Sequence, residues 1–329
     1  MQAYLIRRLL LTIPTLLIVT MVVFMLVRFI PGNVLDMMVA EMSSTSGEEF
    51  KDVEGLRKAL GLDVSIPVQY GRWLGITPRA DGKISGILQG NLGRSLWTNE
   101  PVTEIFRTRI PVSIEMAMFA NVFQWGLAVP LGVYMATRQD SFWDYSGRIF
   151  AIVMLSMPGF WLATMVIVYP SIWWGVMPNI VYVPIVVDPI GNLMQFILPA
   201  FLVGVASSAG LMRLTRTMML EVLRQDYVRT AWAKGLQERV VLMRHVVKNA
   251  AIPVVTVLGA ELPALISGQI IMEQIFALPG MGRVFIQALN QRDYPVISGF
   301  NTLVAVLVLI ANVIVDISYA WLDPRIRYK

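Results

Sequence analysis

Long apolar runs alternate with charged segments along the whole chain. Runs of about 20 mainly apolar residues lie near positions 9–30, 113–136, 149–174, 196–214, 252–276 and 296–320. About 18 or more apolar residues are enough to cross a bilayer as a helix. The pattern therefore predicts an all-α polytopic membrane protein with six transmembrane helices.

The polar segments between these runs suggest how the chain is organised. We expect an N-terminal transmembrane helix at 1–31, an external loop region at 32–112, a core of helices 2–6 at 113–322 and a tail at 323–329. A loop of this length contains structure of its own or has a function. The proline-rich stretch 175–195 has no Lys or Arg. Its apolar patch at 180–187 is too short to span, so we place it in the outer interface.

The distribution of Lys and Arg orients these spans. With six spans, both termini lie on one side, and most basic residues outside the 33–112 region lie on that side too. The two short loops on the opposite side contain only Arg283 and Arg292. Cytoplasmic loops carry the excess of basic residues, so both termini are predicted to be cytoplasmic. The net charge of +5 reflects this placement and does not indicate a nucleic-acid partner.

Composition excludes several kinds of chemistry. The chain is 56% hydrophobic with a mean hydropathy of +0.63, and it has no cysteine and one histidine. Thiolate and multi-histidine metal sites are therefore ruled out. We find no nucleotide-binding phosphate loop and no catalytic constellation. We expect no enzyme activity and no cofactor in this chain, so any ATP must be bound by another chain.

The charged stretch between the fourth and fifth runs is patterned like folded structure. Asp226 is a plausible N-cap for a short helix that ends at Gly235. The residues expected on its apolar face are Tyr227, Val228, Ala231 and Trp232. A second helix is predicted from about Gln237, with an apolar stripe at helical spacing. That stripe consists of Leu236, Val240, Met243 and Val247.

The same stretch carries a family resemblance. Residues 226–235 read Asp-Tyr-Val-Arg-Thr-Ala-Trp-Ala-Lys-Gly, and Lys248-Asn249 follow. This pattern resembles the dipeptide, oligopeptide and nickel branch of the binding-protein-dependent ABC importer permeases. Arg229-Thr230-Ala231 occupies the Glu-Ala-Ala positions of the general family pattern, and Gly235 is in place. Further similar segments are Ile13-Pro14-Thr15, Gly90 to Ser95, Pro279 to Gly282, Asp293-Tyr294-Pro295 and Asp323-Pro324-Arg325.

The resemblance implies a type I ABC importer architecture in a bacterial or archaeal cytoplasmic membrane. The expected partners are a homologous second permease, two ATP-binding cassette subunits that hold ATP and Mg²⁺, and an extracytoplasmic solute-binding protein. Residues 226–249 would form the loop that couples to an ATPase subunit. The residues matching that loop are Asp226, Tyr227, Arg229, Thr230, Ala231, Lys234 and Gly235.

The external segments and the substrate are less closely specified. Pro279, Gly280, Gly282, Asp293 and Tyr294 are candidates for an external gate or for contacts with the binding protein. The branch handles peptides, nickel complexes, oligosaccharides and other small solutes, so the substrate stays open. A passive channel and a membrane-embedded enzyme are the alternatives from other classes, and stable association with ATPase chains would separate the importer from both.

A few polar residues fall inside or near the apolar runs. Glu261 lies deep in the fifth run, where a charge costs at least ~2.5 kcal/mol and should face protein or water. It either lines a translocation path or forms a hydrogen bond to a neighbouring helix. Ser207 and Ser208 permit close helix packing or contact the substrate. Arg28 is expected to reach the interface, as is Glu273 near the end of its run.

Overall fold

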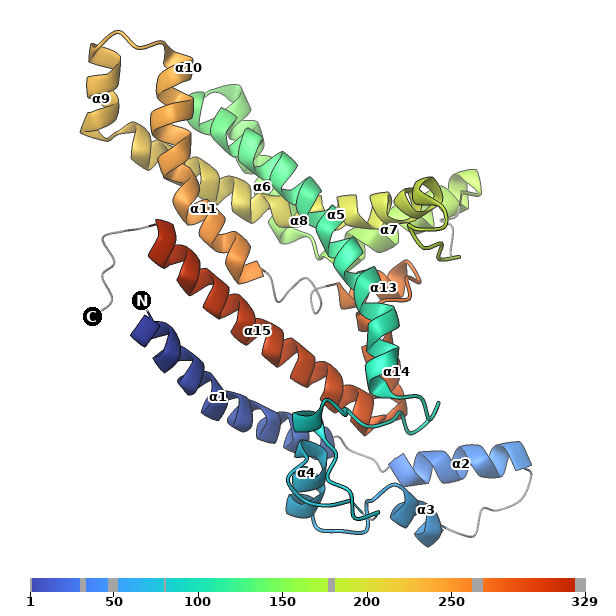
Figure 1. Cartoon of the computed structure of the whole chain (residues 1–329). Coiled ribbons are helices and arrows are strands. Elements are labelled where there is room, and N and C mark those ends of the chain that lie inside the picture. Colours follow the sequence, from blue (N-terminus) through green and yellow to red (C-terminus); the bar gives the residue numbers. More distant parts are fainter. Residues whose placement is uncertain are drawn as a thin grey trace. The chain divides into compact units, whose positions relative to one another are not determined.

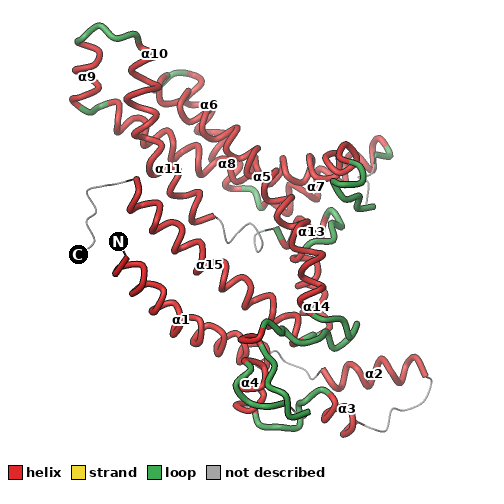
Figure 2. The backbone as a smooth tube through the Cα atoms, in the orientation of Figure 1, coloured by secondary structure: helices red, strands yellow, loops and turns green. Residues whose placement is uncertain are grey.

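The computed structural model describes residues 2–29, 34–46, 53–79, 81–176, 181–261 and 269–322. Within these ranges the regular structure is helical, apart from one isolated bridge between Arg94 and Pro101 (Figure 2). Lipid offers no hydrogen-bond partner to the backbone, and a helix satisfies its own peptide groups. The predicted all-α class is therefore confirmed.

The chain forms two compact units. The first consists of Met1–Pro111, Gly280–Ile310 and Tyr328–Lys329, and the second of Val112–Pro279 and Ala311–Arg327. Helices α5 (Val102–Thr137) and α15 (Tyr294–Leu322) each contribute residues to both units (Figure 1). The units are described separately below.

The first unit contains the predicted external region, and that region has helices of its own. In addition to parts of α5 and α15, the helices are α1 (Gln2–Phe29), α2 (Val34–Ser46), α3 (Val53–Ala59), α4 (Ile66–Leu74), the 3₁₀ turn η1 (Ile87–Gln89) and α14 (Met281–Gln291). Helix α4 ends at Gly75, which has a φ of 88°. A Cβ there would lie 2.0 Å from Gln89 Oε1, so both the backbone and the space require glycine. The predicted short external loop that holds Arg283 and Arg292 contains α14, and no helix was predicted there.

Aromatic packing fixes α4 against α1. The ring centroid of Phe24 lies 5.3 Å from that of Tyr70 and 5.4 Å from that of Trp73. Arg28 donates from Nε and from its terminal nitrogen to Gln69 Oε1, at 3.2 and 2.5 Å. Its guanidinium also lies over the Phe24 ring, 3.8 Å from the centroid. The expectation that Arg28 reaches the interface stays a prediction, and α4 supplies its guanidinium with a partner that the local pattern did not indicate.

The second unit is built around the long helix α8 (Pro189–Leu223), which lies against α6 (Phe142–Ser156), α7 (Gly159–Trp174) and α11 (Lys248–Glu261). The helix begins at Pro189 because Asp188 caps it, its Oδ1 accepting from Ile190 N and Gly191 N. The predicted fourth span therefore starts earlier than position 196. The second span also starts earlier, at Val102 instead of 113.

The predicted third span is broken. Helices α6 and α7 meet at 91° instead of forming one helix through Pro158. Met157 is extended, with φ −94° and ψ 124°, and Pro158 is the N-cap of α7. Proline has no N–H to donate and forces the preceding residue out of the helical region, so α6 ends here. The expectation of one continuous helix over the run 149–174 was therefore wrong.

Several of the described helices are suited to a membrane. Those long and apolar enough to cross it cover Val102–Thr137, Pro189–Leu223, Glu238–Val257 and Tyr294–Val313, and the bent pair α6–α7 adds a fifth if it counts as one span. The described apolar part of α1, Leu10–Leu26, is shorter. The polytopic class is confirmed, whereas the number six is not reproduced among the described residues.

A buried ion cluster joins α6 to α8. The carboxylate of Asp144 is fully buried and accepts from Arg216 Nε at 2.7 Å and from the Arg216 terminal nitrogen at 2.8 Å. Arg148 donates to the same carboxylate at 2.5 Å, and the backbone N–H of Asp140 donates at 3.0 Å. Two helices 72 residues apart in the sequence are thus held by a bidentate pair, the strongest common geometry for such a contact.

We expect Asp144→Asn to destabilise the protein by about 3 kcal/mol, because it leaves Arg216 mostly buried without a counter-charge. The measurement is thermal unfolding of the purified protein in detergent. Asp140→Asn is the matched control, since Asp140 also contacts Arg148 but is largely exposed. The control should change stability by less than about 1 kcal/mol. Equal effects of the two substitutions would contradict the role given to Asp144.

Candidate functional site

The charged stretch forms a short helix, α9 (Asp226–Ala233), as predicted, but its cap differs. Gln225 is the N-cap and Asp226 is the first helical residue. The Asp226 carboxylate is almost fully exposed and lies 3.6 Å from Arg229. A negative charge in the first turn still favours the helix through its dipole. The prediction that Asp226 is the N-cap was therefore wrong by one position.

Gly235 ends the helix as predicted. Its φ is 75°, its N–H donates to Trp232 O, and the N–H of Leu236 donates back to Ala231 O. A Cβ on Gly235 would meet no atom within 4 Å. The positive φ, and not a lack of space, is what favours glycine at this turn.

Only part of the predicted apolar face of α9 is buried. Val228 and Ala231 pack into a cluster with Ala136 of α5, Met219 of α8, Val241, Val246 and Ala250. In contrast, Tyr227 and Trp232 remain 44% and 42% exposed. Helix α9 is therefore anchored by one narrow face and presents two aromatic side chains to the outside.

The helix that follows α9 contains a π-helical segment. After α10 (Glu238–Val240) comes η2 (Val241–Val247), which continues directly into α11. The predicted stripe was wrong for Leu236, Val240 and Met243, which are exposed. Its fourth member, Val247, does pack against the buried cluster, and the buried positions of this helix are Val241, Val246 and Ala250. A π turn is closed by i→i+5 hydrogen bonds, so the buried positions come at wider spacing than in an α-helix.

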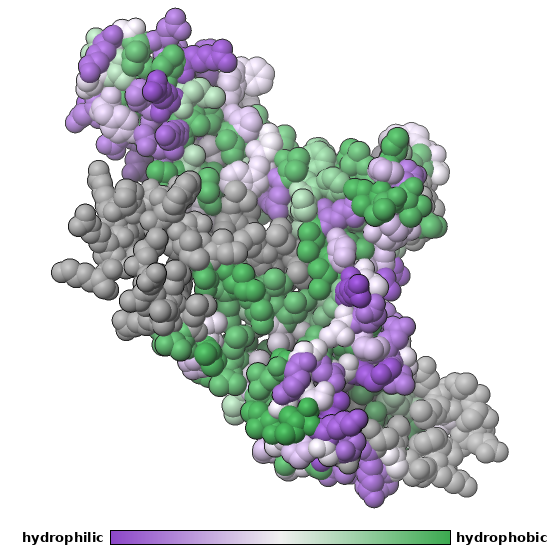
Figure 3. Space-filling view, viewed as in Figure 1, coloured by the Kyte–Doolittle hydropathy of each residue, from purple (hydrophilic) through white to green (hydrophobic). Residues whose placement is uncertain are grey.

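Together, α9 and η2 form an exposed surface of mixed character. The large apolar side chains that stay exposed on it are Tyr227, Trp232, Leu236, Val240 and Met243. Exposed basic residues lie among them, at Arg229, Lys234, Arg239, Arg244 and Lys248. Figure 3 shows hydrophilic residues gathered over this end of the second unit. We call this surface, residues 226–249, the coupling surface, after the role that the family resemblance implies for it.

Hydrogen bonds fix the coupling surface to the helix behind it. The amide of Asn249 donates to the Tyr227 hydroxyl at 3.1 Å and to His245 O at 2.6 Å. His245, the single histidine, therefore contributes its backbone here. The Thr230 hydroxyl, in turn, bonds within α9, to Asp226 O. The predicted coupling residues thus lie together on one short segment, held to α8, η2 and α11.

The candidate polar residues inside the apolar runs lie in different environments. Ser208 is buried and its hydroxyl donates to Val205 O, whereas Ser207 is exposed. A Cβ at Gly204 would lie 2.7 Å from Ala120 O, so α8 approaches α5 very closely. Gly204 thus permits close packing of α8 against α5, whereas Ser208 bonds within α8. The side chain of Glu261, at the end of α11, lies outside the residues whose side chains are described.

Glu273 in α13 (Ile270–Ile275) was expected to reach the interface, and this was wrong. Its side chain is fully buried and accepts a hydrogen bond from Ser113 Oγ of α5 at 2.5 Å. Nothing in the local pattern indicates this contact, because the two residues are 160 positions apart. In the part of the chain that the structure describes, no group of three or more His, Asp or Glu could hold a metal ion.

The external candidates occupy different environments. Gly280 is the N-cap of α14 and Gly282 is buried in that helix, while Pro279 belongs to the second unit. Asp293 is buried and accepts from Ser95 Oγ at 2.5 Å and from Leu96 N at 3.2 Å. Trp97 Nε1 donates to Gln291 O at 2.8 Å. Asp293 therefore anchors the 95–97 loop, and sequence reasoning had missed Ser95 and Leu96 as its partners.

The structure is that of a multi-pass membrane protein: several helices are suited to the membrane, and buried polar contacts join them. Family comparison makes this specific. The family of binding-protein-dependent transport system inner membrane components matches residues 128–328, and its N-terminal domain matches residues 1–117. The chain belongs to this family.

Several curated relatives align over their whole length. An oligopeptide transport system permease protein, AppB, of Bacillus subtilis is 36% identical over 332 residues, covering all of both chains. Dipeptide transport system permease proteins, DppB, of Alkalihalophilus pseudofirmus and Escherichia coli K12 are 36% and 35% identical, again covering all of both chains. A crystal structure of an amino acid ABC transporter aligns with 68% of this chain and 95% of its own at 13% identity and a TM-score of 0.47, which adds nothing to the assignment.

The buried Asp293 predicts a pH dependence. Burial raises the pKa of the Asp293 carboxyl, although the hydrogen bonds from Ser95 and Leu96 oppose the rise. An acid whose pKa is raised by folding favours the folded state at low pH, and this stabilisation is lost as pH rises from about 4, the unfolded pKa, through the folded value.

We therefore expect wild-type stability to decline more steeply than that of Asp293→Asn between about pH 4 and pH 8. The measurement is the melting temperature of both proteins in detergent across this range. Asp36→Asn, which changes an exposed carboxylate of the same unit, is the control and should follow the wild type. Parallel curves for wild type and Asp293→Asn would refute the assignment.

Proposed function

We propose that this chain is a permease subunit of an ATP-driven importer of peptides, and that the coupling surface transmits the movement of an ATPase subunit to the membrane helices. The observation that carries the coupling role is the exposure of Tyr227 and Trp232 on a helix whose opposite face is anchored. Exposed aromatic residues beside basic ones are typical of protein interfaces. The names of the full-length relatives support a peptide substrate over a nickel complex or an oligosaccharide.

The route of the movement follows the contacts of α9. A push on α9 would reach α8 through Val228 and Met219, which lie in one buried cluster. The ion pair between Arg216 and Asp144 would carry it from α8 to α6. A short rigid helix held in this way can move its neighbours as a body, whereas a mobile loop could not.

The remaining parts of the assembly are proposed from the family. A homologous second permease would complete the path, two ATP-binding cassette subunits would hold ATP and Mg²⁺, and an extracytoplasmic binding protein would deliver the peptide. The coupling surface would then face the cytoplasm, with both termini on the same side of the cytoplasmic membrane. The excess of Lys and Arg in residues 213–248 supports that orientation.

Association with ATPase chains is the first test. Purification of this chain from its native membrane in gentle detergent should recover a second permease and ATP-binding cassette chains, identified by mass spectrometry. Trp232→Ala should reduce the recovered ATPase about tenfold, because large aromatic residues at an interface centre often contribute 2 kcal/mol or more. Trp174→Ala, which truncates an exposed tryptophan at the end of α7, should leave recovery unchanged. Isolation of the wild-type chain by itself would favour a channel.

Gly235 allows coupling to be tested apart from association. Leucine at φ 75° costs roughly 1–2 kcal/mol, so Gly235→Leu should turn the chain away from its path after α9. In reconstituted vesicles, we expect peptide uptake to fall about tenfold while ATP hydrolysis continues, since 1.4 kcal/mol corresponds to tenfold. Asparagine tolerates positive φ, so Gly235→Asn should retain most of the uptake. Normal uptake by Gly235→Leu would remove the coupling role from this turn.

A further inference from the structure

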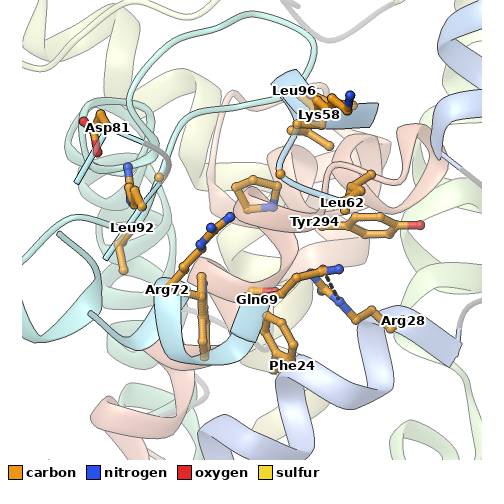
Figure 4. A pocket seen from close by; sticks show the side chains of 17 residues that line it. Phe24, Arg28, Lys58, Leu62, Gln69, Arg72, Asp81, Leu92, Leu96 and Tyr294 are labelled. Carbon is orange, nitrogen blue, oxygen red and sulfur yellow. Dashed lines mark hydrogen bonds between the residues drawn. The ribbon is translucent and has the colours of Figure 1, made fainter. Parts of the chain in front are cut away.

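The first unit contains a cavity of about 410 Å³ whose walls come from α1, α4, the turns after α3 and α4, and the start of α15. Figure 4 shows the guanidinium groups of Arg28 and Arg72 directed toward the same space, with the ring of Tyr294 beside it. The volume is within the range of small-molecule binding sites, roughly 300–1,000 Å³. Two of the family-similar segments reach this cavity, through Leu92 and Gly93 and through Tyr294 and Pro295, but none of its basic residues belongs to them.

The lining has a marked excess of positive charge. Four basic side chains, Arg28, Lys58, Arg72 and Arg79, line the cavity together with a single acid, Asp81. Among the described residues, none of the four forms an ion pair. The hydrogen bonds of Arg28 and Arg72 go to neutral acceptors, Gln69 Oε1 and Pro78 O. The lining therefore favours a bound anion that can accept hydrogen bonds from more than one of these basic side chains.

Aromatic residues give the cavity an aromatic wall beside its basic residues. Phe24, Trp73 and Tyr294 line the same space, and Arg28 lies over the rings of Phe24 and Tyr294, at 3.8 and 5.6 Å. Phe24 lies within the apolar stretch Leu10–Leu26 of α1, and Arg28 follows just beyond it. The cavity thus begins where an apolar helix passes into polar structure, which is the depth at which lipid headgroups lie.

We propose that this cavity binds the phosphate group of an anionic phospholipid. The phosphate would lie between Arg28 and Arg72, with Lys58 at the rim, and the glycerol and upper acyl chain would lie against Phe24 and Trp73. Arginine forks match phosphate oxygens in geometry. A zwitterionic peptide would require matching acids, and Asp81 is the one acid in the lining. Free phosphate shares the headgroup chemistry but would leave the aromatic wall without a partner.

Lipid retention tests the proposal. The full complex, purified from its native membrane, is placed in nanodiscs of phosphatidylcholine containing a minor fraction of phosphatidylglycerol, and the lipid that stays bound is measured by native mass spectrometry. The wild type should retain phosphatidylglycerol in preference to phosphatidylcholine. Lys58→Gln combined with Arg72→Gln should retain about thirtyfold less, since each of the two basic residues near an anionic lipid contributes about 1 kcal/mol and 1.4 kcal/mol corresponds to tenfold.

Matched variants separate the site from general charge and from misfolding. Arg57→Gln with Arg107→Gln removes two exposed charges of the same unit outside the cavity, and it should retain lipid as the wild type does. Arg72→Lys keeps the charge and should restore most of the retention lost in Arg72→Gln. Equal retention by the cavity and control variants, or equal retention of the two lipids by the wild type, would overturn the proposal. If millimolar inorganic phosphate displaced the bound phosphatidylglycerol, the ligand of the cavity would be free phosphate. That result would overturn the proposal of a phospholipid.

Discussion

The absence of hydrogen-bond partners in a hydrocarbon solvent is the constraint on which this structure depends. It explains why the long elements are helices, and two buried acids between those helices have hydrogen-bond partners. Asp144 meets two arginines, and Glu273 meets Ser113. Each pair joins segments far apart in the sequence, so the polar groups that cost most to bury also specify which helices are neighbours. Helix α9 packs against these helices, so its position depends on the contacts that hold them together.

The sequence pattern correctly predicted features that depend on residues close together in the chain. Continuous apolar runs predicted a polytopic helical protein, and a glycine after an amphipathic octamer predicted the turn at Gly235, which has the expected positive φ. The family resemblance rested on the same stretch and was confirmed by the family matches over residues 1–117 and 128–328. Helix ends were less well predicted, as with the cap at Gln225 and the start of α8, since a cap depends on geometry that composition does not encode.

The failures have specific physical reasons. Pro158 ended a helix that hydropathy alone had continued, because hydropathy measures transfer to lipid and not backbone geometry. The apolar stripe after α9 was misplaced since a period of 3.6 was assumed where the helix is locally wider. Contacts such as Ser95 with Asp293, 198 positions apart, and the cavity beside Arg28 leave no trace in local pattern. They arise only when the fold brings distant segments together.

The π-helical segment also affects how the length of this chain can vary. In a uniform α-helix one residue corresponds to about 100° of rotation and 1.5 Å of rise, so deletion of a residue turns everything beyond it away from its neighbours. A π turn already accommodates an extra residue. Loss of one residue within Val241–Val247 can convert the turn to α-helix while both flanking faces keep their partners. Deletion of a single residue is therefore tolerated better here than in a uniform α-helix, and the site of that tolerance lies beside the surface that we propose for coupling.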